Sequence, residues 1–118
     1  MWDNQRALKF LYARTMEDQR GKDPMYEGPL LLEVNFFFHM PQNKKKIFES
    51  LRGSHHHIKP DLSNLIKLIE DAAKGILYHD DALIASINAN KYYADRPRTE
   101  FSIVQLPNPA NKLSIVQI

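Results

Sequence analysis

The sequence contains no cysteine. Disulfide frameworks, zinc–thiolate sites, iron–sulfur clusters and thiol nucleophiles are therefore excluded. No apolar run approaches the roughly 18 residues that a membrane helix needs, and no basic segment followed by an apolar stretch marks a secretory signal. Neither GxxxxGK[ST] nor GxGxxG occurs, so nothing supports nucleotide hydrolysis or dinucleotide binding. We expect a cytoplasmic protein without a membrane partner.

The charges of the chain are nearly balanced. Lys and Arg number 16 and Asp and Glu number 14, which leaves a formal net charge of +2. This balance permits a polyanionic partner without demanding one. With 118 residues, the chain has room for one domain.

Hydrophobic periodicity predicts two main helices and a small sheet. Apolar residues at helical spacing predict helices over 3–20 and 61–74, which Gly21 and Gly75 end. Alternating apolar residues predict a strand over 30–39 and a second, buried strand over 83–93. A third strand over 99–106 follows a short turn, and its spacing suits a hairpin with the second. The fold class is therefore α+β, with a small mixed sheet.

A long polar connection over 41–60 separates the first strand from the second helix. Loops of this length inside a compact domain are often functional. This one carries Lys44, Lys45, Lys46 and Lys59, which can bind phosphate as point charges, although a solvated charge run is the plain alternative. The triplet His55–His57 in the same loop suits either a ligand-facing role or an ordinary polar loop.

Three aspartates flank the second helix and the strand after it. Asp61 begins the helix, and Asp80 and Asp81 immediately precede the strand. If the start of the helix and the start of the strand converge, the three carboxylates gather and need a cation to neutralise them. Such hard oxygen ligands suit magnesium, with manganese as the alternative. The plain alternative is that Asp61 caps a helix and that Asp80 and Asp81 occupy a turn.

The order of motifs resembles the RusA family of Holliday-junction resolvases. The resemblance covers residues 59–104 directly, and the preceding helix and strand fit the same order of elements. Its motifs are Lys59-Pro60-Asp61-Leu62-Ser63-Asn64-Leu65-Ile66-Lys67, Asp71-Ala72, Gly75, Asp80-Asp81, Lys91 and Pro97-Arg98-Thr99-Glu100.

The resemblance implies a magnesium-dependent homodimeric endonuclease that nicks four-way DNA junctions in recombination and repair. Asp61, Asp81 and Lys67 would be catalytic, and Asp61, Asp80 and Asp81 would hold the metal. Lys44, Lys45, Lys46 and Lys59 would bind DNA, and the protein would associate with the nucleoid. A C2 dimer would supply two nicks related by a twofold axis.

The sequence departs from the family in two places. Ser63 stands where the family has a second aspartate, so it would contact the metal or a bound water through a hydroxyl without adding charge. A catalytically weak or inactive junction-binding protein is therefore the alternative. The chain also begins almost at the first helix, so we expect one nuclease domain over 1–106 without the family's N-terminal strand. Residues 107–118 would form a tail or an edge strand, and an interaction module that pairs through 113–118 is a third hypothesis.

Overall fold

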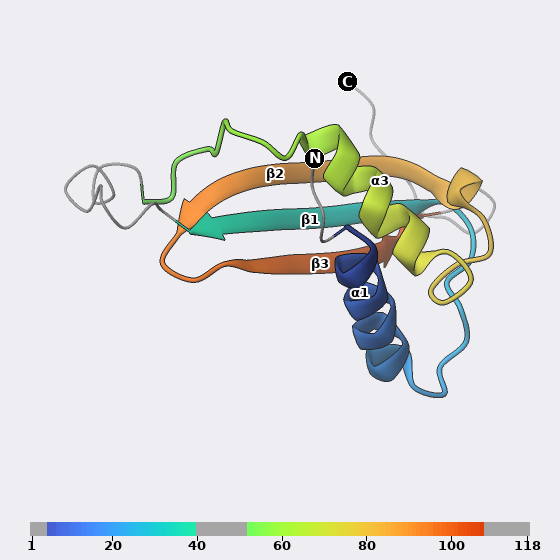
Figure 1. Cartoon of the computed structure of the whole chain (residues 1–118). Coiled ribbons are helices and arrows are strands. Elements are labelled where there is room, and N and C mark those ends of the chain that lie inside the picture. Colours follow the sequence, from blue (N-terminus) through green and yellow to red (C-terminus); the bar gives the residue numbers. More distant parts are fainter. Residues whose placement is uncertain (1–4, 40–51, 108–118) are drawn as a thin grey trace, which may run out of the picture.

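The structure is a computed structural model that describes residues 5–39 and 52–107. Helix α1 (Gln5–Arg20) leads to strand β1 (Leu30–His39), and helix α3 (Leu62–Ala73) follows in the sequence. A short 3₁₀ turn (Asp81–Leu83) then precedes strands β2 (Ile84–Ala94) and β3 (Arg98–Gln105) (Figure 1). The predicted α+β class, with two main helices and a small mixed sheet, is confirmed.

The three strands form one sheet in the order β2-β1-β3. β2 pairs with β1 in parallel, and β3 pairs with β1 antiparallel. The predicted hairpin between the second and third strands is therefore wrong, because β1 lies between them. The physical reason is the composition of β1, LLLEVNFFFH, which makes it the most apolar strand. A central strand is paired along both edges, and such strands carry nearly continuous apolar sequence.

The core lies between the sheet and the two helices, which cover the same face (Figure 1). Alternate residues of β1 point into it, and Leu30, Leu32, Val34 and Phe36 are buried. The predicted period-2 pattern of this strand is confirmed. Met16 of α1 and the apolar face of α3 complete the core on the side of the helices; the buried residues of α3 are Leu65, Leu68, Ile69, Ala72 and Ala73.

Both helices end where the sequence predicts. Gly21 follows α1 with a φ of 57°, and Gly75 follows α3 with a φ of 82°. This left-handed conformation suits glycine, because a side chain there is strained. Within the described residues, no helix is long and apolar enough to cross a membrane.

Strand β2 is less buried than its sequence predicts. Residues 85–88 are exposed, and the strand is buried only near its end, at Lys91 and Tyr93. β2 is an edge strand, so its first half gains little cover from the elements on either side. The second half is covered by residues 53–56, which run antiparallel to it through main-chain hydrogen bonds of Gly53, Ser54 and His56 with Tyr93 and Lys91.

Candidate functional site

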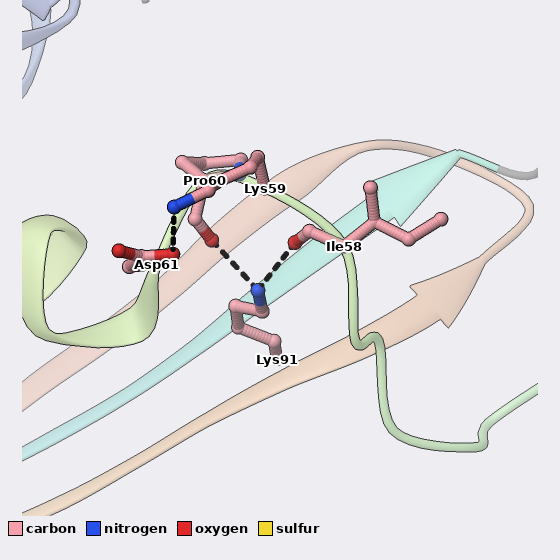
Figure 2. Close-up of polar contacts among 5 residues, drawn as sticks. All are labelled: Ile58, Lys59, Pro60, Asp61 and Lys91. Carbon is pink, nitrogen blue, oxygen red and sulfur yellow. Dashed lines mark hydrogen bonds and ion pairs between the residues drawn. The ribbon is translucent and has the colours of Figure 1, made fainter.

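Asp61 lies at the N-terminal end of α3, where the polar loop enters the helix. Its backbone is extended, and its side chain forms no capping hydrogen bond with α3. The carboxylate instead accepts from Lys59 Nζ at 2.9 Å, across the cis peptide bond between Lys59 and Pro60 (Figure 2). The carboxylate of Asp61 is therefore half-exposed and available at the surface.

Lys91 of β2 holds the segment that leads to Asp61. Its Nζ donates to the main-chain oxygens of Ile58 and Pro60, both at 2.6 Å (Figure 2). Burial lowers the pKa of Lys91, and the nearby charge of Asp61 partly opposes that effect. The motif in the sequence includes Lys91 but does not indicate this role for it. Its burial could be predicted, because Lys91 lies two residues before the buried Tyr93 and therefore on the same side of β2.

Asp80 and Asp81 lie at the opposite end of α3. Asp80 caps the short 3₁₀ turn, and its Oδ1 accepts from the amide of Ala82 at 3.0 Å. Asp81 Oδ1 is buried and has no hydrogen-bond partner among the described residues. The pKa of Glu70, near the C-terminal end of α3, is raised by burial and then by the charges of Asp81 and Asp71.

The three aspartates therefore do not gather within one chain. A helix of 12 residues is about 18 Å long at 1.5 Å per residue, and it separates Asp61 from Asp80 and Asp81. Residues 5–39 and 52–107 contain no group of three or more His, Asp or Glu side chains that could hold a metal ion. The expectation that the helix start and the strand start converge is wrong for the single chain. Among the described residues of one chain, the three aspartates therefore form no shared metal site.

Lys67 lies on the exposed polar face of α3, two turns from Asp61. It shares this face with Asn64 and Asp71, as helical spacing predicts, and all three line a groove between α3 and α1. Arg6 and Lys9 of α1 line the same groove. Ser63 is exposed in the first turn of α3, four residues before Lys67.

Lys59 is the one proposed DNA-binding lysine that the structure describes. Its side chain is exposed beside Asp61. Lys44, Lys45 and Lys46 lie outside the described residues.

The histidine triplet packs against aromatic side chains. His56 stacks on Phe38 with ring centroids 4.2 Å apart, and His55 lies 4.8 Å from Tyr92. Burial lowers the pKa of His56, and the charge of Lys91 lowers it further. These contacts support a structural role at the end of β2 for His55 and His56.

Comparison with known proteins defines the class of enzyme. The family model of endodeoxyribonuclease RusA matches residues 1–104. The chain is also 28% identical over 97 residues to the uncharacterized protein YqaN of Bacillus subtilis (strain 168), a match that covers 78% of this chain and 68% of that protein. No solved structure matches the chain.

The family match places the chain in a family of endodeoxyribonucleases. The chain belongs to the RusA family, the Holliday-junction resolvases that its motifs resemble.

Proposed function

We propose that the protein is a magnesium-dependent, structure-selective endonuclease that nicks four-way DNA junctions in recombination and repair. The observation that carries the proposal is the family match over residues 1–104. Within that range, Asp61, Lys67 and the Asp80-Asp81 pair keep the order and spacing of the motif. Asp61 and Lys67 are exposed at the surface, where a large nucleic acid can reach them.

The proposed roles follow from the charge of each group. Asp61, Asp80 and Asp81 would supply the carboxylate ligands, and a divalent ion on such ligands polarises a phosphodiester and activates water. Lys67 would neutralise charge that develops on the scissile phosphate. Lys59, with Lys44, Lys45 and Lys46, would bind the DNA backbone.

The separation of the aspartates bears directly on the proposed homodimer. We infer that a site that uses both Asp61 and Asp81 is not built within one chain, because Asp61 precedes the N-terminal end of α3 and Asp81 follows its C-terminal end. In a C2 dimer the same surface patch of both copies forms the interface, so a residue at one end of the patch meets the residue at the other end of the partner's patch. We propose that each site combines Asp61 of one copy with Asp81 of the partner subunit, which gives two equivalent sites for two opposing nicks.

A nicking assay on a synthetic four-way junction tests the proposal. We expect symmetric nicks with magnesium, none with EDTA, and little cleavage of a linear duplex that contains the same arm sequences. A protein that cleaves junction and duplex equally would contradict the structure selectivity. A protein that neither binds nor nicks the junction would contradict the proposed function as a whole.

One observation favours a second candidate function. Ser63 brings no charge to the first turn of α3, where the family pattern has an aspartate, so the site has fewer carboxylates to attract a metal. The second candidate is a junction-binding protein with weak or no cleavage. Salt-sensitive binding to the junction without magnesium-dependent nicking would select it.

A further inference from the structure

The outer surfaces of α1 and α3 form a groove that carries excess positive charge. Its volume is about 470 Å³, and its polar lining contains Arg6 and Lys9 of α1 and Asn64, Lys67 and Asp71 of α3. Three cationic side chains thus face one carboxylate. Arg6 and Lys9 are three residues apart, as are Asn64 and Lys67, so each pair occupies one face of its helix.

The three cationic side chains of this groove have no ion-pair or hydrogen-bond partner among the described residues, unlike most other cations in that part of the chain. Within residues 5–39 and 52–107, Arg6, Lys9 and Lys67 form no ion pair or hydrogen bond through their side chains. In contrast, Arg14 pairs with Asp18, Arg52 with Asp95, and Arg98 with Glu100. The groove therefore presents unneutralised charge on a rigid pair of packed helices.

The groove is continuous with the candidate catalytic surface. Asn64 lies one turn after Asp61, and Lys67 lies one turn further along the same face of α3. A DNA strand whose reacting phosphate lies at Lys67 would therefore continue toward α1. Arg6 and Lys9 lie beside Lys67 in the same groove, where they can meet the neighbouring phosphates.

We propose that Arg6 and Lys9 bind the backbone of the DNA strand whose scissile phosphate lies at Lys67. This inference rests on the proposed function and extends its DNA-binding surface to α1, which carries none of the motif residues. The two side chains contact phosphates, so they add affinity and fix the register of the strand without reading its sequence.

The test is the salt dependence of junction binding by Arg6→Ala/Lys9→Ala, measured in EDTA so that no strand is cleaved. Each cation that neutralises a phosphate adds about 0.9 to the slope of log K against log salt. The double variant should bind more weakly, and its slope should be shallower by about two. Alanine has high helix propensity, so α1 should keep its structure, which circular dichroism verifies.

A matched control separates the groove from the overall charge. Arg14→Ala/Lys22→Ala also removes one arginine and one lysine, from the second half of α1 and the turn after it, outside the groove. The Arg14–Asp18 pair that it breaks is exposed and contributes little to stability. We expect this control to keep the parent slope.

The results that would contradict the groove assignment differ from those that would contradict the proposed nuclease function. An unchanged slope for Arg6→Ala/Lys9→Ala, or an equal loss in both double variants, would overturn the assignment of the groove even if the parent nicks junctions normally. Failure of the parent to bind DNA at all would overturn both proposals. A selective loss in Arg6→Ala/Lys9→Ala supports the groove, whether or not the parent cleaves.

Discussion

Lys91 Nζ donates to the carbonyl oxygen of Pro60 at 2.6 Å, one residue before Asp61. A buried cation in β2 thereby fixes the chain at the point where it enters α3. The same ammonium group also donates to Ile58, so two carbonyl groups on either side of Lys59 depend on it. Lys91 is a positioning residue, since it acts on Asp61 through the backbone of 58–60.

Replacing Lys91 by methionine should release this segment. Methionine keeps much of the side-chain length but donates no hydrogen bond, so the carbonyls of Ile58 and Pro60 lose a charged donor. We expect the free energy of unfolding to fall by about 2 kcal/mol, as measured by urea denaturation. Junction nicking should fall more than junction binding, because Asp61 is displaced while the exposed cations remain.

Lys59→Met is the matched control for that variant. The Lys59–Asp61 ion pair is exposed, and such pairs contribute less than about 1 kcal/mol. A Lys91→Met protein as stable as Lys59→Met would show that the two hydrogen bonds of Lys91 do not hold the segment before Asp61.

Mixing two inactive variants tests whether the active site is shared between copies. Asp61→Asn and Asp81→Asn should each abolish nicking while junction binding survives, because asparagine keeps the shape and removes the charge. If each site takes Asp61 and Asp81 from different copies, a mixed dimer has one site with both aspartates and one site with neither. Mixing the two variants after subunit exchange should then restore nicking of one strand.

The double variant Asp61→Asn/Asp81→Asn, mixed with the parent, is the control for this experiment. Its mixed dimers carry one altered aspartate in each site and should be inactive. Nicking in this mixture above the amount that the remaining parent homodimers explain, with none from the two single variants, would place both aspartates in the same copy's site.

Ser63→Asp should lower the magnesium concentration that nicking requires. The added carboxylate lies in the exposed first turn of α3, two residues after Asp61, and extra negative charge favours a divalent cation. A magnesium titration of the nicking rate measures the change, and Ser63→Asn controls for size without charge. A Ser63→Asp curve that coincides with the parent, or shifts to higher magnesium, would show that the serine site is already adapted.

Burial of the Tyr12 phenol should make stability depend on alkaline pH. Tyr12 Oη lies 2.6 Å from Thr99 Oγ1 and joins α1 to β3. Burial raises the pKa of Tyr12 above its usual value of 10.0, and the Thr99 hydrogen bond partly opposes the rise. Above pH 10 the unfolded chain releases this proton more readily than the folded chain, so the free energy of unfolding should fall.

Two substitutions separate the effect of the Tyr12–Thr99 hydrogen bond on stability from the effect of Tyr12 ionisation. Tyr12→Phe and Thr99→Val each remove the bond and should cost about 1 kcal/mol at neutral pH. Tyr12→Phe should also reduce the loss of stability between pH 9 and pH 11, whereas Thr99→Val keeps the phenol and its alkaline loss. Urea denaturation across this range measures both effects, and equal pH profiles for the two variants would contradict the assignment to Tyr12.

The sequence predicts those parts of the fold that depend on local periodicity. α1, β1 and α3 agree with prediction to within two residues at their described ends, because apolar spacing and the glycines after each helix are local signals. The pairing of the strands was not predictable in the same way. A short connection from Ala94 to Arg98 is typical of a hairpin, yet both strands pair with β1 instead, because the apolar central strand gains most from two neighbours.

The positions of the three aspartates follow from the parallel pairing of β1 with β2. A helix between two adjacent parallel strands must return the chain to the starting end of the sheet. The N-terminal end of α3, at Asp61, therefore lies away from the start of β2, where Asp80 and Asp81 precede Ile84. The resemblance identified the motif residues, but their spacing along the sequence could not show that α3 separates them. Arg6 and Lys9 were missed because they belong to no motif.

The strand order also governs how the chain reaches its native state. β1 is the first strand in the sequence, but both of its neighbours come late, so that Leu30 pairs with Ile84 on one side and with Gln105 on the other. Contacts between residues so distant in sequence slow folding, because the intervening chain must be ordered before they form. During synthesis, the apolar strand that forms the centre of the sheet leaves the ribosome well before either strand that will cover its edges. The nascent protein therefore passes through a period in which LLLEVNFFFH is unpaired, and an unpaired apolar strand of this kind is prone to aggregation.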